Sequence, residues 1–354
     1  MTGGSHHIPV NVITGFLGSG KTSLLQRLLN SEAFADTAVL INEFGEVGLD
    51  HHLLEEIDEN TLLLQSGCIC CTIRGDLKDA IRDLHSRRER GEIPAFRRLV
   101  IETTGLADPA PILSTITSET VIHRHFRLGN VIATVDAVNA LLHLRRQPES
   151  VKQIAVADRI VLTKTDLAKP GAVKKAKEAI GRINPMVPMI EGANGPIDPF
   201  LLLAQDVHDE SHKLREIELW LAASRHDEDD GHGKLHRHDV NRHDKRIAAF
   251  ALIFDKPMDW TAFGIWLTML LQSRGEDVLR VKGILNVIGV ATPVVIHGVQ
   301  HVVHTPVHMH DWPDDDRRSR IVFIVRDIAK AEIADSLSAF NAVARDLDRE
   351  EDAA

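Results

Sequence analysis

All three cysteines of this 354-residue chain lie within four positions of one another, at Cys68, Cys70 and Cys71. Thiolates are soft ligands that suit Zn²⁺, and three thiolates with one further ligand complete a tetrahedral site. A small buried cluster and a redox-active thiol pair are the alternatives. An apolar core has no reason to crowd three thiols together, so the spacing favours a metal site. Because Gly67 permits a turn, we expect the thiolates to converge within one short loop.

A second group of residues has the spacing of a phosphate-binding loop. Gly15, Gly20, Lys21 and Thr22 fit the pattern Gly-x4-Gly-Lys-Thr, between an apolar β-rich run and a leucine-rich helical pattern. Glycines let backbone N–H groups close around phosphate oxygens, and the helix N-terminus adds partial positive charge. Lys21 would reach the β- and γ-phosphates of a nucleotide, and the Thr22 hydroxyl would ligate Mg²⁺. The alternative is a plain glycine-rich turn before a helix.

Two further segments end in carboxylates that suit a nucleotide. Glu102, in VIETTG (100–105), is expected to hold the Mg²⁺ shell or orient water, and a strand-end carboxylate in a local hydrogen bond is the alternative. The N–H of Gly105 would reach the γ-phosphate. Asp166, in TKTD (163–166), can accept two hydrogen bonds from guanine N1–H and its amino group, which adenine does not offer. With the stem of Lys164 against the base, the pattern favours GTP over ATP.

These patterns give two sets of candidate residues. Four are expected to act in hydrolysis: Lys21, Thr22, Glu102 and Gly105. The expected nucleotide-binding residues are Gly15, Gly18, Ser19, Gly20, Lys21, Thr22, Ser23, Thr163, Lys164 and Asp166.

The cysteine segment does not itself supply a fourth metal ligand. Glu43, in NEFGE (42–46), is our first candidate, because this segment is expected to form a loop over the γ-phosphate. A water molecule or a residue of a partner protein would serve if the metal is passed on. The cysteines lie between NEFGE and ETTG (102–105), so a metal site here would adjoin both segments expected to sense the γ-phosphate.

Alternating strands and helices are expected to position these residues. Strand-like runs occur at 8–14, 37–44, 97–104, 130–137 and 159–166, and helical patterns such as 72–91 separate several of them. This alternation predicts an α/β fold, with a mostly parallel sheet that gathers ligands at the carboxyl ends of its strands. From residue 246 the pattern becomes α+β. It holds a strand-like run at 247–254, a helix capped by Asp259, three further strand patterns and a closing helix at 328–347.

Composition excludes several classes of protein. A net charge of −10, no tyrosine and 4% aromatic residues argue against a nucleic-acid partner. The N-terminal segment lacks a basic region, and no apolar run reaches the length of a spanning helix, so no membrane partner is expected. Clustered cysteines in odd number indicate reduced thiols, and we expect a cytoplasmic location.

Many of the 20 histidines fall in two segments. Residues 225–245 hold five among charged residues, which is typical of a linker that binds metal weakly or only connects domains. The second group is His297, His301, His304, His308 and His310. In a strand, His308 and His310 would face the same way and could share a metal; a polar face of a C-terminal sheet is the alternative.

The motifs together resemble the CobW-like family of P-loop GTPases. Five segments occur in the family's order: GFLGSGKT, INEFGEVGLD, GCICC, ETTGLADP and TKTD. The resemblance covers residues 8 to 205 and extends more weakly through 278–285 and 317–327. It implies GTP hydrolysis coupled to delivery of a transition metal, usually Zn²⁺ or Co²⁺, to a client metalloprotein. Thr163 replaces the Asn of the common Asn-Lys-x-Asp motif, so a bracing amide is missing and modest nucleotide affinity is expected.

The expected organisation is a P-loop NTPase domain at 1–215, a His-rich charged linker at 216–245 and a smaller C-terminal α+β domain at 246–354. The sequence does not decide the oligomeric state, and a homodimer is one possibility. Two other functions remain as alternatives: a GTP-controlled assembly or regulatory switch with a purely structural zinc site, and a thiol redox sensor that binds nucleotide.

Overall fold

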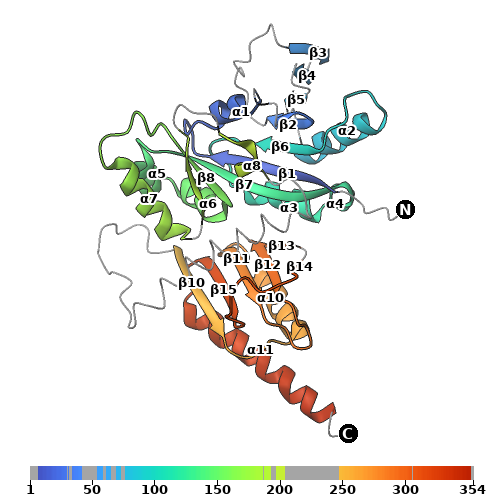
Figure 1. The fold of residues 1–354 in the computed structure, drawn as a ribbon, viewed down its shortest axis with the longest axis vertical. Helices are drawn as coiled ribbons and strands as arrows, with labels where there is room; N and C mark the ends of the chain where they lie inside the picture. Colours follow the sequence, from blue (N-terminus) through green and yellow to red (C-terminus); the bar gives the residue numbers. More distant parts are fainter. Residues whose placement is uncertain are drawn as a thin grey trace. The chain divides into compact units, whose positions relative to one another are not determined.

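The computed structural model describes most of the chain. The described residues are 7–29, 31, 34–41, 54–58, 61–64, 69–72, 76–185, 187–192, 197–203, 247–304 and 306–351. The chain divides into two compact units (Figure 1), Met1–Gly181 with Val187–Asp209, and Arg182–Met186 with Glu210–Ala354. The expected linker lies outside the described residues, so the two boundaries at 215/216 and 245/246 stay predictions.

The first unit is built on a nine-stranded sheet of order β3-β4-β5-β2-β6-β1-β7-β8-β9. Its strands are β1 Ile8–Gly15, β2 Thr37–Ile41, β3 Leu54–Asp58, β4 Thr61–Leu64, β5 Ile69–Thr72, β6 Arg98–Glu102, β7 Phe126–Asp136, β8 Arg159–Thr163 and β9 Met189–Glu191. Pairing is parallel from β5 through to β9, and β3 and β4 add an antiparallel edge. The mostly parallel sheet is confirmed.

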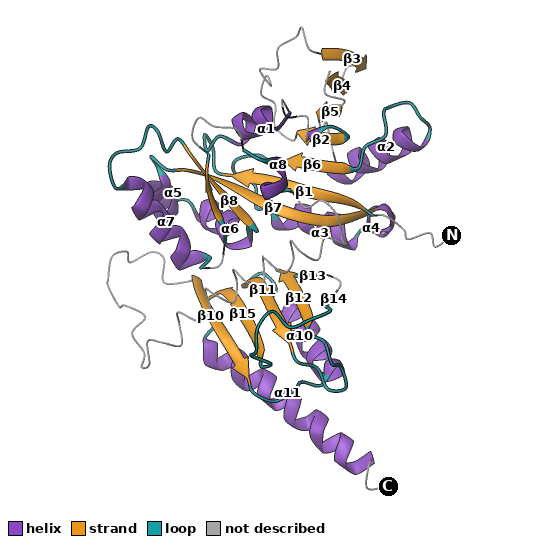
Figure 2. Ribbon diagram, in the orientation of Figure 1, coloured by secondary structure: helices purple, strands orange, loops and turns teal. Residues whose placement is uncertain are grey.

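Helices lie on both sides of this sheet (Figure 2). They are α1 Lys21–Leu29, α2 Leu77–Glu89, α3 Ala110–Ser118, α4 Thr120–His125, α5 Ala140–Arg146, α6 Pro148–Val156, α7 Ala172–Ile183 and α8 Pro199–Leu202. All eight residues of β1 are buried, as expected for a mainly apolar strand in a sheet covered on both faces. Leucines at helical spacing in α1, including Leu24 and Leu28, pack against Ile13 and Val161 of the sheet.

The observed elements differ from the expected ones in length. Strand β2 ends at Ile41, and the rest of the expected run lies outside the described residues. Strand β7 begins at Phe126, before the expected start at 130. Helix α2 begins only at Leu77, because Thr72 still pairs with Ile41 and the Asp76 side chain caps the helix, accepting from Lys78 N at 2.8 Å. The prediction of helix from residue 72 was therefore wrong.

The second unit contains an antiparallel sheet of order β10-β15-β11-β12-β13, with β14 paired to β12. Its elements are β10 Ile247–Phe254, α10 Trp260–Arg274, β11 Val278–Leu285, β12 Val294–Val299, β13 Val302–Val303, β14 Val307–His308, β15 Ser319–Arg326 and α11 Lys330–Glu351. Phe263 of α10 and Leu337 of α11 share one core with Phe323 of β15. Asp259 caps α10 as expected, accepting from Ala262 N at 2.6 Å.

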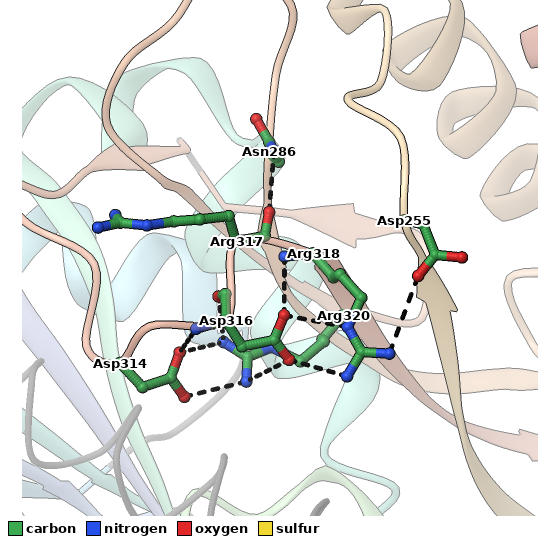
Figure 3. Close-up of polar contacts among 7 residues, drawn as sticks. All are labelled: Asp255, Asn286, Asp314, Asp316, Arg317, Arg318 and Arg320. Atoms are coloured by element: carbon green, nitrogen blue, oxygen red, sulfur yellow. Dashed lines mark hydrogen bonds and ion pairs between the residues drawn. The ribbon is translucent and has the colours of Figure 1, made fainter.

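A charged network holds the segment before β15 against this sheet (Figure 3). The guanidinium of Arg320, a residue only 4% exposed, donates to both carboxylate oxygens of Asp314 at 3.1 Å each. Arg318 donates to Asp316, and this hydrogen bond holds the pKa of the Asp316 carboxyl below its usual value. Arg320 also lies 3.5 Å from Asp316, so loss of the arginine would leave two partly buried carboxylates without their shared partner and should destabilise the fold more than loss of Asp314 alone.

None of the helices that the structure describes combines the length and apolar character needed to cross a lipid bilayer.

Candidate functional site

The phosphate loop joins β1 to α1 at the carboxyl edge of the sheet, as expected. Gly15, Gly18 and Gly20 have φ values of 143°, 69° and 90°, which side chains rarely tolerate. A Cβ atom on Gly15 would clash with the Thr134 hydroxyl. The Ser19 hydroxyl forms a 2.6 Å hydrogen bond with the Thr134 hydroxyl, so β7 supports the loop from beneath.

Lys21, Thr22 and Glu102 meet at this edge. In the register of β1 and β6, Glu102 lies beside Ile13. Thr22 Oγ1 donates to Glu102 Oε1 at 2.8 Å, and Lys21 Nζ donates to the Gly15 carbonyl at 3.1 Å. A hydroxyl and a carboxylate are hard oxygen donors of the kind that Mg²⁺ prefers, so this donor set fits the expected ion.

The loop after β6 lies directly against the phosphate loop. A Cβ atom on Gly105 would lie 2.8 Å from the backbone N of Leu17, so only glycine permits this approach. Thr103 Oγ1 donates to Thr14 Oγ1 at 3.0 Å and ties the two strand ends together. Gly105 is thereby placed beside the phosphate loop, where its expected role requires it to be.

The residues expected to recognise the base lie at the end of β8 and just after it. Thr163 Oγ1 donates to the Ser19 carbonyl at 2.7 Å, so this hydroxyl braces the phosphate loop. The bracing amide is absent, as expected, but a hydroxyl on β8 reaches the phosphate loop in its place. The expected modest nucleotide affinity stays a prediction. Lys164 Nζ donates to the Gly18 carbonyl at 2.7 Å, and Asp166 is exposed in the turn that follows.

Asp136 is a site residue that sequence reasoning missed. It ends β7, is 3% exposed and accepts a 2.8 Å hydrogen bond from Lys164 Nζ. Burial alone would raise its pKa, but hydrogen bonds from Lys164, Asn139 and Val138 N outweigh burial and leave the pKa lowered. Lys164 has a φ of 54°, an uncommon backbone conformation that these side-chain bonds stabilise. A carboxylate at the end of a buried strand, as at Glu102, was the available signal.

We expect Thr163→Val to weaken GTP and GDP binding to the same degree, by about fivefold, since one hydrogen bond is worth about 1 kcal/mol. The buried Ser19 carbonyl loses its donor, while the residues around the γ-phosphate are untouched. Calorimetric titration with both nucleotides checks this, and Thr163→Asn is the matched control that keeps a donor. Wild-type affinity in the valine variant would show that the hydroxyl is not a brace.

The cysteine segment differs from the expected loop. Cys70 and Cys71 belong to strand β5, where they pair in parallel with Val39 and Leu40 of β2. The β-branched neighbours Ile69 and Thr72 favour this extended backbone. Cys68 and Glu43 lie outside the described residues, so the proposed ligand set stays a prediction. Among the described residues, no group of three or more His, Cys, Asp or Glu could hold a metal.

The C-terminal histidines are also placed differently. Strand β14 ends at His308, so the strand expected to align it with His310 does not form, and both residues are exposed. The rings of His297 and His304 lie 5.9 Å apart, and His301 Nδ1 lies 2.8 Å from the Leu271 carbonyl. Among the described residues of this unit, these histidines form no cluster that could hold a metal.

Known proteins match both units. Residues 9–191 match the family described as CobW/HypB/UreG, nucleotide-binding domain, and residues 247–341 match the cobalamin synthesis protein cobW C-terminal domain. The chain is 34% identical to the "Zinc chaperone YjiA" of Escherichia coli K12, over 92% of this chain and 96% of the relative. It is 29% identical to the "Zinc-regulated GTPase metalloprotein activator 1" of Schizosaccharomyces pombe, over 79% of this chain and 72% of the relative.

The crystal structure of the Zn(II)-bound YjiA GTPase from E. coli superimposes with a TM-score of 0.69 and 32% sequence identity. The superposition covers 94% of this chain and 99% of the E. coli chain, so the whole two-unit architecture has a solved counterpart.

Proposed function

Because this protein belongs to the CobW family of nucleotide-binding proteins, we propose that it is a GTP-hydrolysing metallochaperone that binds zinc and passes it to a client metalloprotein. The observation that supports this most is the meeting of Lys21, Thr22 and Glu102 at the carboxyl edge of the sheet, two strands from the cysteine strand. Relatives named as zinc chaperones and GTPases support the choice of metal and nucleotide.

Hydrolysis depends on residues that are already close together. Lys21 donates to the Gly15 carbonyl and would turn from it to the β- and γ-phosphates, while Thr22 and Glu102, which already contact each other, would hold Mg²⁺. When bound, Mg²⁺ neutralises charge that develops on the phosphoryl oxygens. The N–H of Gly105 donates to the γ-phosphate. Catalysis of this kind is mainly positioning and electrostatic stabilisation, which suits a pre-formed loop.

Guanine recognition uses the residues after β8. Asp166 accepts from N1–H and the amino group of guanine, and the stem of Lys164 lies against the base. Asp136 fixes the Lys164 ammonium, so the lysine side chain is ordered before the nucleotide arrives. Ordering in advance lowers the entropic cost of binding.

Zinc is the cargo, and Cys68, Cys70 and Cys71 with Glu43 are its proposed ligands. The register of the sheet gives a physical route from nucleotide to metal. Leu40 of β2 pairs with Cys71 on one side and with Ile101, the neighbour of Glu102, on the other. Since adjacent strands lie about 4.8 Å apart, the Cys71 backbone is roughly 10 Å from that of Ile101. A change at Glu102 can therefore reach the metal site through one strand.

The proposal also covers the identity of the metal, the unit that recognises the client and the location of the protein. The metal is zinc, with Co²⁺ as the alternative that the same soft ligands accept. The second unit recognises the client. A cytoplasmic location follows from the need to keep three clustered thiols reduced.

We expect replacement of Cys68, Cys70 and Cys71 by Ser to remove the tightest zinc site while leaving GTP binding intact, because Ser lacks the soft thiolate. Zinc affinity by chelator competition and GTP affinity by calorimetry measure the two effects. Deletion of residues 226–243 is the matched control: it removes only the weak histidine ligands of the expected linker and leaves the tightest site unchanged. Wild-type zinc affinity in the triple variant would place the cargo elsewhere.

The alternative function is a GTP-controlled assembly or regulatory switch in which zinc only holds the cysteine segment together. Both functions need the same GTPase unit. They differ in whether bound zinc responds to the nucleotide, since a purely structural site has no need to do so.

A further inference from the structure

Gln153, in α6, is a buried polar side chain with no role in the chemistry described so far. It is 1% exposed. Its Nε2 donates to the Gly105 carbonyl at 3.2 Å and to the Ala107 carbonyl at 3.1 Å. An amide NH₂ group has two hydrogens, so both donors are committed to the loop after β6.

This loop is confined between two parts of the fold. On one side, Gly105 is so close to Leu17 of the phosphate loop that a Cβ atom would lie 2.6 Å from the Leu17 side chain. On the other side, Gln153 holds the carbonyl of the same glycine. Glycine moves freely between backbone conformations, so an external anchor is needed to fix the peptide groups around it.

A second contact from α6 holds the next part of the loop. Lys152 Nζ lies 2.6 Å from Asp108 Oδ2, and Asp108 Oδ1 accepts from Ala110 N at the start of α3. Helix α6 therefore contacts this loop at Gly105, Ala107 and Asp108. The chain then leaves α6 directly for β8, which ends at the base-recognition residues.

We propose that Gln153 is a positioning residue for GTP hydrolysis, which fixes the backbone from Gly105 to Ala107 in the geometry that recognises the γ-phosphate. The inference rests on the proposed GTPase function. If the loop moves away, the buried amide of Gln153 loses both acceptors, and an unpaired buried polar group is costly. Helix α6 thus stabilises the loop at 105–107 in the observed position. A loop already held in this position binds the γ-phosphate more tightly.

The test replaces Gln153 with Met, which keeps the length and burial of the side chain and removes both donors. We expect kcat to fall roughly 10- to 100-fold, because small displacements of positioning groups have effects of this size. GDP affinity should be unchanged, since GDP has no γ-phosphate. The ratio of affinities for a non-hydrolysable GTP analogue and GDP should fall. Gln153→Asn is the second variant: its amide is one methylene too short to make both bonds.

Val151→Ala is the matched control, because Val151 is also buried in α6 but its loss creates only a cavity. It should lower the melting temperature and leave both kcat and the affinity ratio unchanged. Wild-type kcat and affinity ratio in folded Gln153→Met and Gln153→Asn would overturn the inference. Equal losses of GTP-analogue and GDP affinity, in step with stability, would overturn it too. Absence of GTP hydrolysis by the wild-type protein would instead reject the proposed function itself.

Discussion

Replacing Lys21 with Ala is expected to abolish GTP turnover while the protein stays folded. We expect kcat to fall at least about 100-fold, because the change removes a preorganised charge from a desolvated site. Lys21 is only 5% exposed, and its ammonium group rests on the Gly15 carbonyl 3.1 Å away. In this position it has a short path to the phosphates and little water to compete with them. Steady-state phosphate release by the purified variant measures the loss.

The fold is expected to survive because Lys21→Ala removes a buried charge without opening the leucine core beneath it. Leu25 and Leu28 of α1 stay packed against the sheet. Lys175→Ala, an exposed position on α7 with the same change of charge, is the matched control and should turn over GTP at the wild-type rate. If Lys21→Ala also hydrolysed GTP at the wild-type rate, the phosphate-loop assignment would be wrong.

Wild-type protein is expected to bind GTP at least about 100-fold more tightly than ATP, because hydrogen bonds to a charged group are worth about 1.5–3 kcal/mol each. Asp166 is exposed in the turn after β8. Asp166→Asn should lose most of this preference, since an amide nitrogen opposes the guanine amino group with a donor. Calorimetry with both nucleotides measures the ratio.

A positive control follows from the same chemistry. Xanthine has a carbonyl where guanine has its 2-amino group. The amide introduced by Asp166→Asn should therefore donate to this carbonyl, and the variant should bind xanthosine triphosphate better than the wild-type protein does. Asp315→Asn, which changes an exposed carboxylate in the second unit, should leave all three nucleotide affinities unchanged. Equal affinities of the wild-type protein for GTP and ATP would contradict the role of Asp166.

Local sequence patterns were enough to predict the phosphate-binding end of the site. Its geometry is set by glycines with positive φ between one strand and one helix, and all of these residues are close in sequence. The positions of Glu102 and Asp166 could be predicted because parallel strands bring their carboxyl ends to one edge, while their roles stay predictions. Which side chains contact one another at this carboxyl edge depends on the order of the strands in the sheet, not on the composition of any one segment.

The supporting contacts could not be predicted, because each joins distant parts of the chain. The Thr163 hydroxyl reaches Ser19 across 144 positions, and Gln153 reaches Gly105 across 48. Only the packing of β8 and α6 beside the phosphate loop creates these bonds. The extended backbone at Cys70 and Cys71 was missed for a similar reason, since pairing with β2 rather than local sequence places them in a strand.

In the proposed zinc chaperone, the nucleotide state should control the affinity for zinc. This dependence is tested most directly by zinc affinity, measured by chelator competition in the presence of a non-hydrolysable GTP analogue and, separately, of GDP. Cys71 of β5 and Glu102 of β6 lie on strands that both pair with β2, so zinc and nucleotide binding should be coupled. The account predicts that the two zinc affinities differ by about 5- to 150-fold, and that zinc changes nucleotide affinity by the same factor. Identical zinc affinities in both nucleotide states would contradict the zinc-chaperone function. They would indicate a purely structural zinc site in a GTP-controlled switch.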